Sequence, residues 1–350
     1  MDQKYNSIAT ALIILATIGI FYVLVVGEAV LVPLAVAVMV WYIINAMSRT
    51  YAKILPKIEQ PNKLTTFASL VTIGLFTYFS VDMIRGNIAD VSAAAPAYKA
   101  NLDVLTQKLV TKFNLQKAPN INEMIKSIEI APLITKLAGS FTNAIGNVFL
   151  VLIYVLFLML EQGTFSKKII ALFPNTRKRN SILSILSHTQ DDIQTYIWIK
   201  TLTSSATGVI SYIILKLVGV DFAGFWAFTI FLLNFIPTIG SIIATVFPAL
   251  LALIQFGSFF ECLVVLVAVG AVQVVIGNFV EPKMMGNTLN LSPLVVMLSL
   301  TLWGSIWGIS GMFLSVPITV ILLIVFAHFD KTRAIAIILS GNGDLKFAEK

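Results

Sequence analysis

The segment 222–327 is almost wholly apolar, yet proline and glycine interrupt it in two places. The interrupting residues are Pro237 and Gly240 in its first part and Gly304, Gly308 and Gly311 in its second part. Hydrocarbon supplies no hydrogen bonds, so broken backbone is stable at membrane depth only where it lines a cavity or is buried in protein. Paired interruptions of hydrophobic segments are the best sequence pointer to the binding site of a membrane transporter.

The amino-acid composition agrees with a membrane location. Hydrophobic residues make up 58% of the chain and charged residues 12%, well below the ~25% charged residues of soluble domains. This apolar surface exceeds what one soluble core can bury, so we expect an all-α polytopic membrane protein in contact with the lipid bilayer. The net charge of +7 is explained by Lys and Arg in loops on one side of the bilayer, and no nucleic-acid partner is expected.

About eight hydrophobic segments are expected. The first three, within residues 1–84, are the N-terminal transmembrane helices 8–26, 29–47 and 64–83. Their lengths are close to the ~20 residues that cross a ~30 Å hydrocarbon core. Only Gly27 and Glu28 separate the first two, which predicts a tight helical hairpin. Further single spans are expected at 141–160, 197–218 and 261–276.

Two less apolar regions lie between these spans. Residues 85–140 contain Pro96, Pro119 and Pro132, and we expect a small extracytoplasmic insert of a few short helices that are broken at these prolines. Residues 161–200 are amphipathic and basic. They are expected to form a cytoplasmic linker within the C-terminal transmembrane transport region, 141–350.

Positive charge is distributed unevenly among the short loops. Lys and Arg cluster within 49–63, 167–179 and 331–333, whereas the loops near 27, 219 and 257 carry almost none. Because short cytoplasmic loops carry the excess of Lys and Arg, we expect both termini to be cytoplasmic and the insert to lie outside.

The helical limbs beside each interruption are short. Residues 222–236 and 240–256 would form helices of about 22 and 25 Å, less than the ~30 Å core of a bilayer. A re-entrant hairpin with its tip at 237–240 fits better than two full spans, and the limbs 291–302 and 312–327 predict a second one. The hairpins would enter from opposite sides, with their tips approaching each other near the midplane. The distribution of Lys and Arg among the loops does not distinguish re-entrant hairpins from full spans, because both arrangements place the following loops on the same sides of the membrane.

Four sequence strings carry a resemblance to a known family: LLNFIPTIGS, GNFVEPKMMG, LSPLVVMLSLTLWG and GMFLSVPITV. Together with the paired N-terminal spans, and with YIWIKT before the fifth span, they resemble the autoinducer-2 exporter family over the whole chain. The resemblance implies a multi-pass permease of the bacterial inner membrane without ATP-hydrolysing machinery. It also implies a homo-oligomer, expected to be a pentamer. Functions within the family differ, between export of the quorum-sensing signal autoinducer-2 and cation/proton antiport.

Asn234, Pro237 and Gly240 are the candidate substrate-pathway residues of the first interruption. Pro237 frees a backbone carbonyl one turn earlier, and Gly240 permits close approach of a ligand or a helix. Asn234 and the freed backbone groups would bind a small, neutral, hydroxyl-rich solute. The alternative stays open that Asn234 caps a helix end and that Gly240 is a packing contact.

Polar residues also lie in the span that follows. Gln273, Asn278 and Glu281 interrupt an apolar stretch, and polar groups in membrane segments are functional candidates by default. Gln273 and Asn278 are candidate pathway residues, although Gln273 could instead form an interhelical hydrogen bond. Glu281 is a possible proton or cation site, although a pair with Lys283 or a helix-end cap is the simpler explanation. The candidate pathway is completed by Gly304, Gly308 and Gly311.

No enzymatic activity, catalytic residue, cofactor or metal site is predicted, since the sequence has no Walker loop, no G-x-S-x-G motif and no cluster of His or Cys. His188 lies near Asp191 and Asp192, but a surface helix start explains this spacing better than metal binding does. Three functions remain. They are a secondary transporter or exporter of a small polar solute such as autoinducer-2, a cation/proton antiporter, and a membrane organiser that transports nothing.

Overall fold

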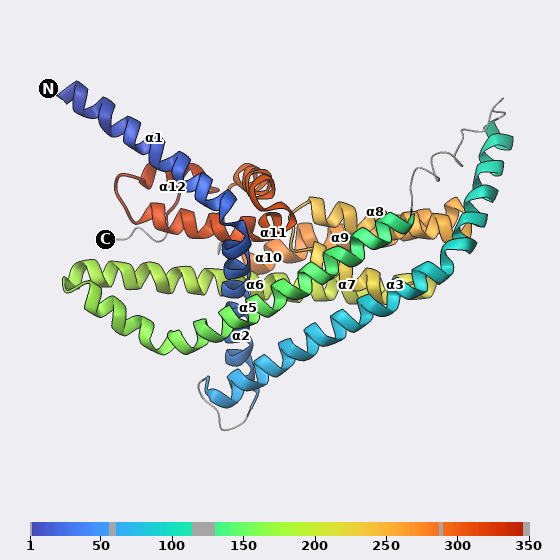
Figure 1. Ribbon diagram of the computed structural model, residues 1–350, viewed down its shortest axis with the longest axis horizontal. Helices are drawn as coiled ribbons and strands as arrows, with labels where there is room; N and C mark the ends of the chain where they lie inside the picture. Colours follow the sequence, from blue (N-terminus) through green and yellow to red (C-terminus); the bar gives the residue numbers. More distant parts are fainter. Residues whose placement is uncertain (1, 56–60, 114–129, 287–289, 346–350) are drawn as a thin grey trace. The chain divides into compact units, whose positions relative to one another are not determined.

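The computed structural model describes residues 2–55, 61–113, 130–286 and 290–345 (Figure 1). Within these ranges the chain is helical, apart from turns and one isolated β-bridge. Seven of the described helices are long and apolar enough to cross a bilayer, so the prediction of an all-α polytopic membrane protein is confirmed. The first compact unit comprises Met1–Tyr42, Gly146–Ile193 and Asn290–Lys350, and the second comprises Ile43–Ile145 and Gln194–Leu289.

The first two apolar segments form α1 (Asp2–Val26) and α2 (Glu28–Ile54). The predicted tight hairpin is wrong. Helical hydrogen bonding continues through the junction, because the Gly27 amide donates to the Val23 carbonyl oxygen at 2.8 Å and the Leu31 amide donates to the Gly27 carbonyl oxygen at 2.9 Å. One intervening residue is too short to reverse the chain, since connections between antiparallel helices need about two residues or more. The two helices therefore follow end to end (Figure 1).

The third span belongs to α3 (Lys63–Phe113), which runs on far beyond it. Asn62 caps its start, since the Asn62 side-chain oxygen accepts from the Leu64 amide at 3.0 Å. The predicted helix break at Pro96 is wrong, because α3 continues through it. A proline removes one backbone hydrogen bond and can bend a long helix without ending it.

The predicted breaks at the other two prolines have different outcomes. Pro119 lies outside the described residues. Pro132 lies in the first turn of α5 (Ile130–Leu172), where its missing amide costs no helical hydrogen bond. A chain of only three residues connects α5 to α6 (Thr176–Val218). The basic segment 161–200 is therefore made mostly of the adjoining ends of two long helices.

The first predicted hairpin is formed by α7 (Ala223–Leu233) and α8 (Ile239–Phe256), which pack against each other. We call this pair the first hairpin. At 11 residues, α7 is about 16 Å long. The chain continues in α9 (Phe259–Val275), which packs along α8, and then in the π-helical turn η1 (Ile276–Val280) and the short α10 (Glu281–Met285).

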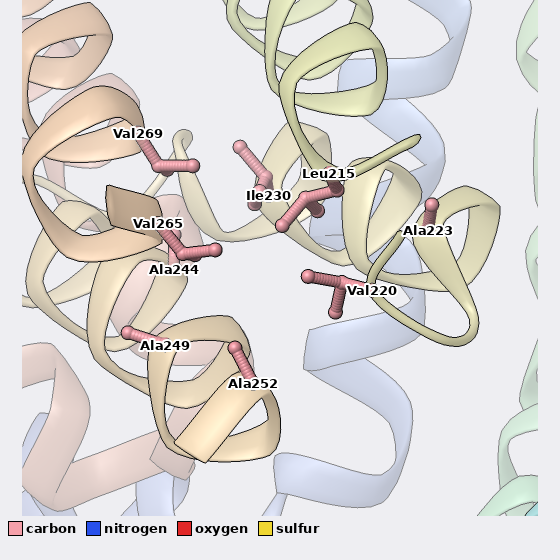
Figure 2. Close-up of a cluster of buried hydrophobic side chains, with 9 residues drawn as sticks. All are labelled: Leu215, Val220, Ala223, Ile230, Ala244, Ala249, Ala252, Val265 and Val269. Carbon is pink, nitrogen blue, oxygen red and sulfur yellow. The ribbon is translucent and has the colours of Figure 1, made fainter. Parts of the chain in front are cut away.

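A core of small and branched apolar side chains holds these helices together (Figure 2). Its residues come from α6, the turn after it, α7, α8 and α9, and they are Leu215, Val220, Ala223, Ile230, Ala244, Ala249, Ala252, Val265 and Val269. The three core residues of α8 are all alanine. Small side chains allow helix backbones to approach closely, which is the usual basis of helix packing in membranes.

The far part of α3 is tied to the base of the first hairpin by polar contacts. The Tyr98 hydroxyl donates to Asp221 at 2.8 Å, and the Lys108 ammonium donates to the Gly257 carbonyl oxygen at 3.1 Å. The Gln255 side-chain oxygen accepts from the Asp221 amide at 2.7 Å. Through these contacts, the turn before α7 and the end of α8 are both held against α3.

The second predicted hairpin lies within α11 (Pro293–Ala327), and we call it the second hairpin. The backbone leaves the helical region at Trp307 and Gly308. The side chains of Ser299 and Thr319 are hydrogen-bonded to each other, although 20 residues of straight helix would separate them by about 30 Å. The segment therefore folds back on itself, as predicted. Its base packs against α12 (Arg333–Leu339).

Candidate functional site

The tip of the first hairpin is a strained, tightly packed break. Between α7 and α8 the backbone forms successive turns, and Thr238 has a φ of 58°. A positive φ is unusual for a β-branched residue and indicates strain. A Cβ at Gly240 would lie 1.8 Å from the Leu233 carbonyl oxygen. The break predicted at Pro237 and Gly240 is therefore present, and Gly240 is a backbone packing contact.

Asn234 ends α7 at this break and is buried. Its side-chain nitrogen donates to the Thr207 hydroxyl of α6 at 3.4 Å. This separation is longer than that of a typical N–H···O hydrogen bond, so the bond is weak. The contact places Asn234 against the face of α6 that carries Thr207.

That face of α6 is a continuous buried polar surface, which we call the α6 polar stripe. Its members are each less than 10% exposed and are Tyr196, Lys200, Thr203, Ser204, Thr207 and Ser211. At 100° per residue, their spacing places them within an arc of about 100°. The hydroxyls of Thr203 and Thr207 donate to backbone carbonyls of their own helix. Those of Ser204 and Ser211 have no hydrogen-bond partner among the described residues.

Gln273 of α9 supplies a further unpaired polar group. Its side chain is 7% exposed, and its nitrogen has no hydrogen-bond partner within the described part of the chain. A Cβ at Gly270 would lie 3.6 Å from the Thr245 methyl of α8. Three residues further along α9, Gln273 is displaced by about 4.5 Å toward the start of α8. Gln273 therefore lies near the depth of the hairpin tip.

Glu281 forms a buried ion pair with α6. Its carboxylate lies 2.6 Å from the Lys200 ammonium, and the two side chains are 14% and 9% exposed. The Thr203 hydroxyl lies 3.5 Å from the other carboxylate oxygen. The pairing with Lys283 considered from the sequence is wrong, because Lys200 is the partner. Lys283 is exposed.

The π-helical turn η1 explains how Gln273 and Glu281 can share one face of the chain. Eight residues of regular α-helix rotate by about 800°, which would leave the two side chains about 80° apart. A π turn accommodates one additional residue, so the remaining rotation returns to within about 20° of the same face. Asn278 lies on this turn and is exposed. The structure therefore does not bring Asn278 to the α6 polar stripe.

The candidate glycines of the second hairpin lie in the first unit and have separate roles. A Cβ at Gly311 would lie 1.8 Å from the Trp303 carbonyl oxygen, and one at Gly304 would lie 2.9 Å from the Met312 side chain. Gly308 has open space around it but a φ of 59° and a ψ of −139°, a conformation available essentially to glycine alone. These residues therefore shape the fold of the tip.

Sequence reasoning missed the α6 polar stripe. Lys200 falls within the predicted basic linker 161–200, and the predicted site includes none of the small hydroxyl residues after it. The available signal was their recurrence at intervals of three and four residues in YIWIKTLTSSATGVIS, which places polar groups on one face of an apolar helix. Within the described ranges, no three His, Cys, Asp or Glu side chains group in a way that could hold a metal ion.

Known proteins are similar to this chain in sequence. Residues 12–331 match the model of the AI-2E family transporter. A Haemophilus influenzae protein, whose name assigns it to transport provisionally, is 32% identical over 99% of this chain and 98% of its own length. The AI-2 transport protein TqsA of Escherichia coli is 36% identical over 59% of each chain. A Borreliella burgdorferi protein with the same provisional name as the first is 28% identical over 94% of this chain and 89% of its own.

The family match spans most of the sequence, and the match to the Haemophilus relative extends over nearly the whole of both proteins. The broken hairpins and the multiple membrane-spanning helices agree with the resemblance noted in the sequence. The chain therefore belongs to the AI-2E transporter family, whose members are multi-pass membrane proteins.

Proposed function

We propose that this chain is a secondary transporter that exports a small, neutral, hydroxyl-rich solute, with autoinducer-2 as the first candidate. The observation that carries the proposal is a set of polar groups on and beside the α6 polar stripe, those of Ser204, Ser211 and Gln273, that have no hydrogen-bond partner among the residues that the structure describes. Buried polar groups without partners are costly in an apolar setting. A transported solute would supply the missing hydrogen bonds. TqsA, a relative named an AI-2 transport protein, supports the choice of candidate.

The neutral groups are suited to a neutral solute. Serine hydroxyls donate and accept, and a glutamine amide does both at adjacent atoms. The long hydrogen bond from Asn234 to Thr207 is easily exchanged for bonds to a solute hydroxyl. We therefore assign recognition to Asn234 and Gln273 together with Ser204.

The first hairpin is proposed to be re-entrant. Its α7 limb of about 16 Å is much shorter than a ~30 Å hydrocarbon core, which supports a tip that ends within the membrane. The remaining parts of the proposal follow from the sequence. They are cytoplasmic termini, an extracytoplasmic region around 85–140, a homo-oligomer, expected to be a pentamer, and Pro237 and Gly240 as the hairpin tip beside the pathway.

Cation/proton antiport is the alternative that one observation favours. Glu281 lies within a helical segment long and apolar enough to span the membrane, and a carboxylate at that depth is a candidate proton or cation site. Lys200 already neutralises this carboxylate, which favours solute transport over antiport.

Flux into proteoliposomes tests the proposal. Autoinducer-2 should cross membranes containing the purified protein faster than it crosses empty liposomes. Ser204→Ala should slow this flux several-fold, because it removes one unpaired hydroxyl of the stripe. Ser205→Ala is the matched control, since Ser205 lies about 100° around the helix from Ser204. Equal flux in both variants would remove the stripe from the pathway, and flux no faster than in empty liposomes would exclude autoinducer-2.

A further inference from the structure

The Lys200–Glu281 pair is buried between two helical segments that are long and apolar enough to cross a membrane. Both residues lie in candidate membrane spans, Ile182–Val218 and Phe259–Met285. The ammonium and the carboxylate are 2.6 Å apart, and neither side chain is more than 14% exposed. An isolated carboxylate in such surroundings is costly, so it requires either a cation or a proton.

Lys200 supplies that positive charge from within the chain. Its long side chain projects from α6 and places the ammonium directly on Oε1 of Glu281. The Thr203 hydroxyl approaches the other carboxylate oxygen. Among the described residues, the titratable groups of α6 that face Glu281 are Lys200 and Tyr196. The Glu281 carboxylate and the Thr203 hydroxyl are thus arranged like the ligands of a small cation site, and the Lys200 ammonium occupies the position of the cation.

We propose that Lys200 is a built-in counter-cation that makes this site independent of external sodium ions and protons. The transport cycle of this chain then needs no bound coupling ion at Glu281. Removal of the ammonium would leave the buried Glu281 carboxylate without a counter-charge. The carboxylate would then have to bind Na⁺ or a proton to remain buried. This inference rests on the proposed function only where solute flux is measured, because ion binding by the folded protein is measurable without a substrate.

The decisive variants change the charge at this site step by step. Lys200→Gln removes the ammonium, Lys200→Arg retains a positive charge, and the double variant Lys200→Gln/Glu281→Gln removes both charges. Lys216→Gln is the matched control, because Lys216 is an exposed lysine in the last turn of the same helix. Thermal unfolding of the full chain in detergent is followed in NaCl and in choline chloride at equal ionic strength, between pH 5 and pH 8.

The expected result is specific to Lys200→Gln. This variant should unfold at a midpoint several degrees higher in NaCl than in choline chloride at pH 8, or at a midpoint that rises by a similar amount as the pH falls from 8 to 5. Wild type, Lys200→Arg, Lys216→Gln and the double variant should show neither response. In proteoliposomes, solute flux should depend on Na⁺ or on pH only in Lys200→Gln.

Two outcomes would overturn the inference. One is a Lys200→Gln midpoint that responds to Na⁺ and pH no more than wild type does. The other is a wild-type midpoint that itself rises in Na⁺. If Lys200→Gln yields no folded protein, the inference requires the double variant to restore folding, because the unpaired carboxylate is the cause. A double variant that also fails to fold contradicts it. Absence of solute flux in wild type counts against the proposed function and leaves the unfolding result unaffected.

Discussion

A Cβ atom at Gly240 would lie 1.8 Å from the carbonyl oxygen of Leu233. Gly311 repeats this relationship in the second hairpin, where a Cβ would lie 1.8 Å from the carbonyl oxygen of Trp303. In each hairpin, the helix after the break passes directly against a backbone carbonyl before it, and only glycine leaves room. Close backbone packing is therefore a shared property of the two hairpins.

The substitution Gly240→Ala should destabilise the protein severely. The obstructing atom belongs to the backbone, so no change of rotamer can relieve the overlap, and the free energy of unfolding should fall by at least about 2 kcal/mol. Gly270→Ala is the matched control, because its methyl would make an ordinary 3.6 Å contact with Thr245. Thermal unfolding compares the two variants. Equal midpoints would show that the first hairpin can open at its tip without cost.

Gly308→Ala tests backbone conformation instead of packing. Apart from its chain neighbours, no atom of the described residues lies within 4 Å of a Cβ at this position, but the φ of 59° should make alanine costly by about 1–3 kcal/mol. Gly277→Ala also enters open space, within a helical segment, and should be neutral or slightly stabilising. The difference between the two unfolding midpoints measures the strain. If the Gly308→Ala variant were as stable as Gly277→Ala, the positive φ of Gly308 in the kink of α11 would be contradicted.

Asn234 and Thr207 should be energetically coupled. A double-mutant cycle with Asn234→Leu and Thr207→Val isolates their hydrogen bond, and a coupling energy of about 0.5–1 kcal/mol is expected for a weak neutral bond. Asn234→Leu should also reduce solute flux strongly. Strict additivity of the two unfolding free energies would mean that the contact contributes nothing to stability.

The Tyr98–Asp221 contact should make stability sensitive to alkaline pH. Burial and the hydrogen bond to Asp221 raise the pKa of the Tyr98 phenol. A group whose pKa is raised by folding stabilises the protein below its unfolded pKa of about 10 and loses this contribution as the pH rises through the folded value. The unfolding midpoint of wild type should therefore fall more steeply above pH 10 than that of Tyr98→Phe. Parallel curves would exclude a contribution from Tyr98.

Local chemistry made both hairpins predictable. Pro237 and the glycines at 240, 308 and 311 impose backbone breaks through rules that need no knowledge of the surroundings. The same rules failed at Pro96, because a proline bends a long helix as readily as it ends one. They failed again at Gly27, because this single residue between α1 and α2 cannot reverse the chain.

The ion pair and the α6 polar stripe could not be read from local patterns. Lys200 precedes an apolar segment, where a lysine usually lies in a loop or at the membrane surface. Its burial depends on the π turn that rotates Glu281 toward α6. Such a pairing over 81 residues is visible only once the helices are placed side by side.

Accessibility of the α6 polar stripe to a polar reagent tests the account most directly. In a Cys262→Ser background, which removes the sole native cysteine, Ser204→Cys should react with a small hydrophilic thiol reagent as the pathway opens during the transport cycle. Val209→Cys, on the exposed apolar side of the same helix, should remain unreactive because it faces lipid. The account predicts labelling at position 204 alone. Unreactive Ser204→Cys, or equal labelling at both positions, would contradict a solute pathway along α6.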